Sequence, residues 1–81
     1  MTFREELRGF VQQHLVREGQ HPVGPDDESL IARGVIDSLG LLQLVLFIEE
    51  RTGVKVPDED VLPDNFDSIS SVDRMVERLR R

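Results

Sequence analysis

The segment from Leu39 to Ile48 is apolar at every position except Gly40 and Gln43, in a chain of only 81 residues. On a helix, where successive residues are rotated by about 100°, these apolar side chains form two stripes on different faces. One stripe holds Leu41, Leu44, Val45 and Ile48, and the other holds Leu39, Leu42 and Leu46. A chain of this size can bury one stripe in a modest core but hardly both. The second stripe is therefore either an exposed docking surface, bordered by Glu49 and Glu50, or is covered by a loop.

The rest of the chain also has helical periodicity, and no segment alternates convincingly enough to be a strand. Thr2 and Glu5 form a capping box, and Gly53 has the position of a left-handed helix cap. The predicted helices cover residues 3–18, residues 38–52, a short helix from Pro57 that Pro63 stops, and a last helix that begins at Ser70. Residues 19–37 are predicted to be a long loop that is pinned to the core by Leu30, Ile31, Val35 and Ile36. The expected fold class is all-α, a small bundle of three longer helices and one short helix, with Val72, Met75, Val76 and Leu79 of the last helix facing inward.

Charge and composition restrict the possible partners and the compartment. Between Asp26 and Asp67 eleven acidic residues stand against three basic ones, a net charge of −8, whereas the whole chain carries −6. This field repels nucleic acid and favours partners with basic surfaces. The chain has no cysteine, its longest apolar run is Leu44–Ile48, and its first six residues mix both charge signs. We therefore expect a single domain, 1–81, in the cytoplasm, with no membrane insertion and no signal peptide.

Ser38 stands directly before the apolar segment, at the predicted start of its helix. Such a serine is most simply a helix cap, but its hydroxyl could also be an attachment point. A phosphodiester there would meet the unpaired amides of a helix N-terminus, and Asp37 would serve recognition by a modifying enzyme. Catalysis is rejected, because Ile36 stands where a nucleophile elbow needs glycine, and the hydroxyl has no evident base, since the two histidines fall on the first predicted helix and in the loop. The residues alone leave cap and attachment point open.

No metal site is predicted. The acidic residues Asp58, Glu59 and Asp60 lack the glycine and the terminal glutamate of a calcium loop at the required spacing. His14 and His21 have no convergent ligands.

The run GVIDSLGLLQLVLFIEERTGVKVPDEDVLPDNFDSISSV resembles the acyl carrier protein family, which includes peptidyl and aminoacyl carriers. The resemblance covers essentially the whole chain. The tripeptide Asp37-Ser38-Leu39 alone is a weak motif. It becomes specific with the features that follow at matching spacing: the acidic helix end Glu49-Glu50, Gly53, the turn Val56-Pro57-Asp58 and the segment from Phe66 to Val72.

The resemblance implies a carrier and not an enzyme. In this family a phosphopantetheinyl transferase uses magnesium and coenzyme A to attach a phosphopantetheine arm to the serine that corresponds to Ser38. The terminal thiol of the arm holds acyl groups as thioesters, and a flexible tether raises their effective concentration at several active sites. Matching positions imply that the partner-contact residues are Asp37, Leu39, Leu42, Leu46, Glu49, Glu50 and Asp58. The implied partners are the transferase and acyl- or aminoacyl-loading and downstream biosynthetic enzymes with basic docking surfaces, met transiently by a monomer.

Two positions depart from the pattern of fatty-acid-synthesis carriers. Those carriers usually have acids directly after Asp-Ser-Leu and three positions later, where this chain has Gly40 and Gln43. We therefore expect a free-standing carrier of polyketide, nonribosomal-peptide or aminoacyl metabolism. The alternatives are a fatty-acid-synthesis carrier, or a helical protein-interaction module in which Ser38 is only a helix cap.

Overall fold

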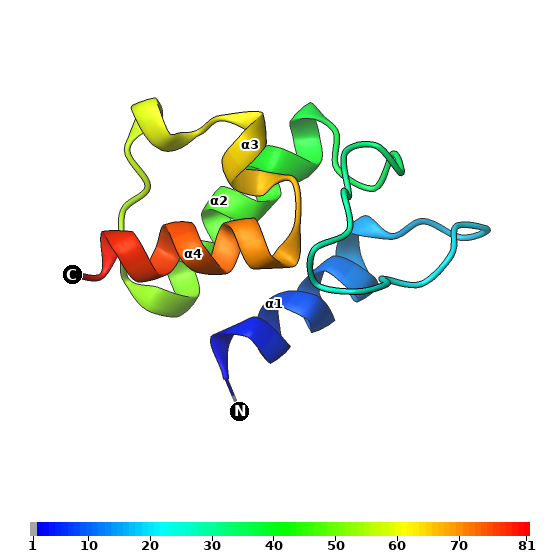
Figure 1. Cartoon of the computed structure of the whole chain (residues 1–81), viewed down its shortest axis with the longest axis horizontal. Helices are drawn as coiled ribbons and strands as arrows, with labels where there is room; N and C mark the ends of the chain where they lie inside the picture. Colours follow the sequence, from blue (N-terminus) through cyan, green and yellow to red (C-terminus); the bar gives the residue numbers. More distant parts are fainter. Residues whose placement is uncertain (1) are drawn as a thin grey trace.

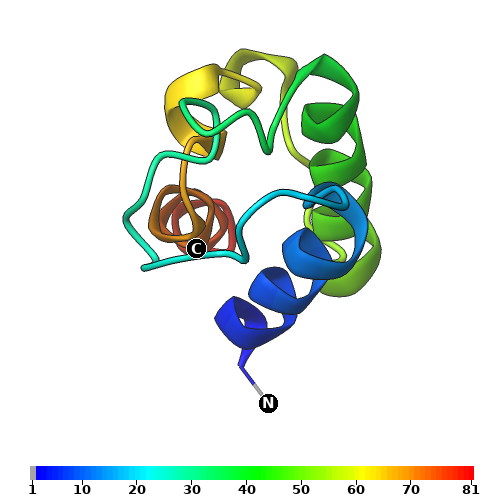
Figure 2. The same cartoon turned by 90° about the vertical axis from the view of Figure 1, so that its right-hand side faces the viewer.

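The computed structural model describes residues 2–81, and within that range every regular element is helical (Figure 1). In chain order the elements are α1 (Phe3–Phe10), the π-helix η1 (Val11–Leu15), α2 (Ser38–Thr52), the 3₁₀-helix η2 (Asp58–Asp60), α3 (Pro63–Phe66) and α4 (Ile69–Leu79). The predicted all-α bundle is confirmed, with α1, α2 and α4 as its longer helices. The helices α2 and α4 lie on opposite sides of the molecule, and η2 and α3 close one end (Figure 2).

The first helix begins as predicted but ends early. The Thr2 hydroxyl accepts from the Glu5 amide and the Glu5 carboxylate accepts from the Thr2 amide, so the capping box is present. From Val11 the helix widens, and the Val16 amide donates to the Val11 carbonyl at 2.9 Å, five residues back. Val16 is then extended, with φ −75° and ψ 121°. The predicted end at residue 18 is wrong, because the wide turn closes at Leu15 and the next residues form a separate turn.

The connection from Val16 to Asp37 is irregular but tied to the core. Leu30, Val35 and Ile36 are buried, as predicted, whereas the predicted anchor Ile31 is 38% exposed. The Leu30 amide donates to the Asp67 carbonyl at 2.6 Å, and the Ser70 amide donates to the Asp26 carbonyl at 2.9 Å. The loop is therefore held by the segment that leads into α4.

The helix α2 agrees with its predicted bounds. It ends at Thr52, and Gly53 follows with φ +73° and donates its amide to the Glu49 carbonyl. Glycine adopts this left-handed conformation without the steric penalty of a Cβ.

Three boundaries in the last third of the chain were predicted wrongly. Pro57 precedes η2 instead of occupying its first position. Pro63 does not only stop the preceding element; it is the first residue of α3, where a missing N–H costs nothing. The last helix is capped by Ser68, whose hydroxyl accepts from the Ser71 amide at 3.0 Å, so it begins at Ile69 and not at Ser70.

The core unites one face of each long helix with the buried loop residues. Its fourteen buried hydrophobic residues are Leu7, Val11, Leu15, Leu30, Val35, Ile36, Leu44, Ile48, Val56, Phe66, Ile69, Val72, Met75 and Val76. Leu79 of α4 is partly buried against them, so the predicted inward face of the last helix is confirmed. Every helix within residues 2–81 is too short or too polar to cross a membrane.

Candidate functional site

The start of α2 is capped by Asp37. Its backbone is extended, and its Oδ1 accepts a hydrogen bond from the Gly40 amide at 2.8 Å. Ser38 is already the first helical residue, so the interpretation of Ser38 as the helix cap is wrong. The Gly40 amide holds the pKa of Asp37 below its ordinary value, and the guanidinium of Arg17 adds to this effect. Asp37 is therefore ionised at neutral pH.

The second carboxylate oxygen of Asp37 forms an ion pair with Arg17, which lies near the start of the long loop. Asp37 Oδ2 accepts from an Arg17 guanidinium nitrogen at 2.9 Å. No sequence pattern points to Arg17, because it lies twenty residues before Asp37, at the end of the predicted first helix. Only the path of the loop brings the two side chains together.

Ser38 is exposed, and its hydroxyl makes no hydrogen bond to any of the residues 2–81. It lies at a shallow pocket of about 260 Å³ with largely apolar walls. The other lining residues are Ile31, Ile36, Asp37, Leu41 and Pro63. A hydroxyl in this position can be reached by another protein and substituted without loss of an internal bond. The pocket offers apolar surface next to whatever group is attached there.

The second apolar stripe of α2 is exposed. Leu39, Leu42 and Leu46 are 64%, 60% and 64% accessible, whereas Leu44 of the first stripe is fully buried. Of the two alternatives for this stripe, exposure is therefore confirmed, and coverage by the long loop is wrong. Ile31 and Leu62 add exposed apolar surface that was not predicted from the sequence. Pro63, next to Leu62, lines the same pocket as Ser38, so this surface extends beyond α2.

Besides Asp37, the predicted partner surface contains three acidic residues, and their environments differ. Glu49 is turned toward the chain after α2, where its Oε2 accepts from the Val56 amide at 3.0 Å. Glu50 is exposed and forms no ion pair within residues 2–81. Asp58 is exposed at the start of η2. Glu50 and Asp58 are thus available to a partner, whereas Glu49 already accepts the hydrogen bond from the Val56 amide.

Within residues 2–81 neither histidine forms a hydrogen bond with the Ser38 hydroxyl. The His14 ring lies 5.0 Å from the Phe10 ring on the first helix, and His21 lies in the loop. Within residues 2–81 no group of three His, Cys, Asp or Glu side chains could hold a metal ion. The arrangement fits a hydroxyl that is modified by another protein.

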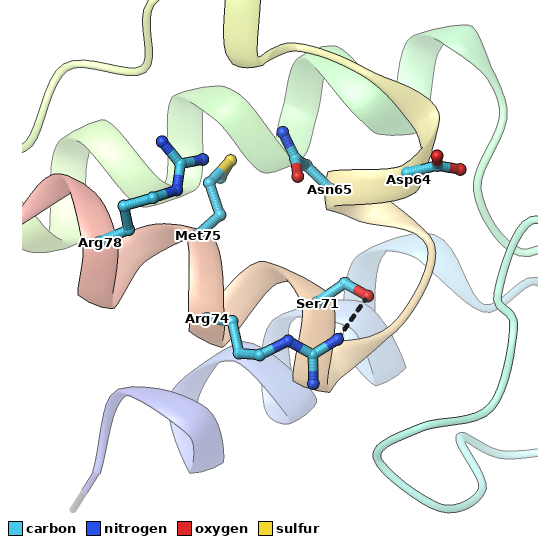
Figure 3. A pocket seen from close by; sticks show the side chains of 6 residues that line it. All are labelled: Asp64, Asn65, Ser71, Arg74, Met75 and Arg78. Carbon is cyan, nitrogen blue, oxygen red and sulfur yellow. Dashed lines mark hydrogen bonds between the residues drawn. The ribbon is translucent and has the colours of Figure 1, made fainter.

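A different hollow, of about 310 Å³, lies between α3 and α4 (Figure 3). Its lining residues are Asp64, Asn65, Ser71, Arg74, Met75 and Arg78. Arg78 is engaged by the carboxylate of Asp60 at 2.9 Å. None of the predicted site residues lines this hollow, so it is separate from the surface around Ser38.

Comparison with known proteins shows which proteins this chain is similar to. Residues 11–79 match the family described as "Phosphopantetheine attachment site". Aminoacyl carrier protein 2 of Bradyrhizobium diazoefficiens is 27% identical over 70 residues, which cover 86% of this chain and 73% of that protein. The D-alanyl carrier protein of Streptococcus pyogenes serotype M5 is 33% identical over 54 residues, which cover 67% of this chain and 68% of that protein.

Proposed function

Because this chain belongs to the phosphopantetheine attachment-site family of carrier proteins, we propose that its phosphopantetheine arm is attached to Ser38. The observation that supports this position best is the division of roles at the start of α2. Asp37 supplies the cap, so the exposed Ser38 hydroxyl has no structural bond to keep. The apolar pocket beside Ser38 offers a surface on which the first part of the attached phosphopantetheine can pack.

The modification requires a phosphopantetheinyl transferase, coenzyme A and magnesium. The Ser38 oxygen forms a bond to the phosphorus nearer the pantetheine, and the pyrophosphate P–O bond breaks. Adenosine 3′,5′-bisphosphate leaves, and the hydroxyl proton passes to a base of the transferase. Within this chain Ser38 contributes the accepting oxygen, and Asp37 keeps the helix start fixed. The attached group supplies a terminal thiol that holds acyl groups as thioesters, and we assign no catalysis to the chain itself.

The exposed stripe Leu39, Leu42 and Leu46 is the proposed docking surface for the transferase and for the enzymes that load and use the carrier. An apolar stripe bordered by the unpaired Glu50 and by Asp58 fits partners that present apolar side chains within a basic surface. A stripe of this size supports transient contacts, which suit a monomer that visits several enzymes in the cytoplasm.

The proposed cargo is an amino acid. The names of the two relatives, an aminoacyl and a D-alanyl carrier, support this choice. The absence of acids at Gly40 and Gln43 also weakens the match to fatty-acid-synthesis partners that dock by charge at the front of α2. The interaction-module alternative loses its basis, because Ser38 is not the helix cap.

The first test is the intact mass after incubation with coenzyme A, magnesium and a broad-specificity phosphopantetheinyl transferase. The wild type is expected to gain one phosphopantetheine, Ser38→Ala none, and the matched control Ser70→Ala, at the start of α4, the same gain as the wild type. No gain by folded wild-type protein without an arm, or a gain by Ser38→Ala, would refute Ser38 as the attachment residue.

The cargo is tested separately on the modified protein. Aminoacyl-adenylating enzymes with a panel of amino acids should load it, whereas malonyl-transferring and elongating enzymes should do so poorly. Efficient turnover by the malonyl-transferring and elongating enzymes would favour the fatty-acid alternative and refute the aminoacyl assignment.

A further inference from the structure

Arg17 is held beside the attachment segment by its own turn. Its amide donates to Gln20 Oε1 at 2.7 Å, and its carbonyl accepts from the Gln20 amide at 3.0 Å. The Gln20 side-chain amide also reaches the Gly34 carbonyl, at 3.4 Å, so this turn is linked to the part of the loop that leads to Asp37. The backbone of Arg17 is therefore fixed relative to the start of α2, although its side chain is 62% exposed.

The guanidinium of Arg17 retains unused hydrogen-bonding capacity. A guanidinium has five N–H donors, and within residues 2–81 that of Arg17 makes one hydrogen bond, to Asp37 Oδ2. The remaining donors make no hydrogen bond within residues 2–81, and the side chain is largely exposed, so they can bind a further anion near Asp37. Arginine binds carboxylate and phosphate oxygens with the same planar fork, so one guanidinium can serve both anions.

Attachment of phosphopantetheine creates an electrostatic problem that the unmodified chain does not have. The new phosphodiester is an anion on the residue next to Asp37, which is itself ionised. The Cα atoms of adjacent residues are about 3.8 Å apart, so the second negative charge is added to the same short segment and repels the first. Among residues 2–81, Arg17 is the cation that pairs with this segment.

We propose that Arg17 is a positioning residue for the prosthetic group, whose guanidinium bridges the Asp37 carboxylate and the phosphodiester on Ser38. This inference rests on the proposed attachment to Ser38. It gives the loop a function beyond connection, because the turn at Arg17 supplies the counter-charge that fixes the root of the arm.

The test compares unmodified and modified forms of the wild type, Arg17→Gln and the control Arg74→Gln, an exposed arginine at the separate hollow between α3 and α4. The first readout is the ³¹P chemical shift of the modified proteins. Arg17→Gln is expected to move the phosphodiester signal, and Arg74→Gln to leave it unchanged.

The second readout is stability, measured by urea unfolding at low salt. For each variant, the folding equilibrium constant of the modified protein is divided by that of the unmodified protein. We expect Arg17→Gln to lower this ratio about 1.5- to 5-fold, which is the range of an exposed ion pair, and we expect high salt to remove the difference.

Comparing the two forms cancels the loss of the Arg17–Asp37 pair, which affects both alike. Arg17→Lys keeps the charge without the fork and should restore most of the stability ratio but not the ³¹P shift. An unchanged ³¹P shift with an unchanged ratio in Arg17→Gln would overturn the inference, while the mass gain would still support Ser38 as the attachment residue. Failure of the wild type to gain mass would instead overturn the proposed function.

Discussion

Asp37 and Gly40 form the hydrogen bond that begins α2, with Oδ1 of the carboxylate accepting from the amide at 2.8 Å. This bond separates two roles that the sequence places on neighbouring residues. Asp37 stabilises the helix start, and Ser38 presents a hydroxyl that the fold does not use. The consequences of this separation can be measured directly.

Replacement of Ser38 by alanine should remove modification without harming the fold. We expect the free energy of unfolding to change by less than about 0.5 kcal/mol, as for a surface substitution that breaks no internal bond. Intact mass and urea unfolding of the same samples measure both effects. A decrease of about 1 kcal/mol in the free energy of unfolding, as for the loss of a helix cap, would show that Ser38 stabilises the helix start.

Asp37→Asn should reduce the pH dependence of stability, because asparagine caps helices as well as aspartate but has no charge. The pKa of Asp37 is lowered in the native state, so its charge stabilises the fold above the unfolded-state pKa of about 3.9. This contribution is lost as the pH falls through that value toward the native pKa. Urea unfolding should therefore separate wild type from variant at about pH 7 and bring them progressively closer as the pH falls below about 3.9.

The control for this pH series is Asp27→Asn, since Asp27 is exposed and makes no ion pair within residues 2–81. It removes one charge without touching the helix start. If Asp27→Asn flattened the pH dependence as much as Asp37→Asn, net charge and not the Asp37 bonds would explain the effect.

The two apolar stripes of α2 should respond differently to the same substitution. Leu44→Ala removes a fully buried side chain and should cost about 2–5 kcal/mol of the free energy of unfolding. Leu42→Ala removes an exposed side chain and should change it by less than about 0.5 kcal/mol. With the transferase, Leu42→Ala should raise KM several-fold with little change in kcat. An unchanged KM in Leu42→Ala and in Leu46→Ala would argue against the stripe as the docking surface.

Glu49 and Glu50 are adjacent acids with different expected roles. Glu49→Ala leaves the Val56 amide without its acceptor and should cost about 1 kcal/mol of the free energy of unfolding. Glu50→Ala should leave stability unchanged and weaken binding to a partner with a basic surface, more at low salt than at high salt. Equal effects of the two variants on stability would contradict this distinction.

The sequence predicts most of the bundle, because hydrophobic periodicity decides which faces are buried. The fully buried Leu44 and the exposed Leu42 both follow from their angular positions on one helix. Asp37 and Ser38 could not be distinguished as caps, because both residue types cap helices and they are neighbours in the chain. The same ambiguity misplaced the last helix, where Ser68 and not Ser70 makes the cap.

Other features depend on tertiary structure that no local pattern encodes. The wide turn that ends at Leu15 has nearly the same periodicity as an α-helix over five residues, so the early end of the first helix has no clear signal. Arg17 meets Asp37 only through the path of a twenty-residue connection. The orientation of the Glu49 side chain depends on the position of the Val56 amide, from which it accepts a hydrogen bond.

The bonds that tie the long loop to the chain before α4 also bear on the order of events during synthesis. Leu30 and Asp26 are fixed by Asp67 and Ser70, which the ribosome adds about thirty residues after Ser38. A nascent chain that has exposed the serine but not this later segment cannot yet complete the loop that leads into it. We therefore expect the transferase to modify Ser38 only after the segment that contains Asp67 and Ser70 has been synthesised.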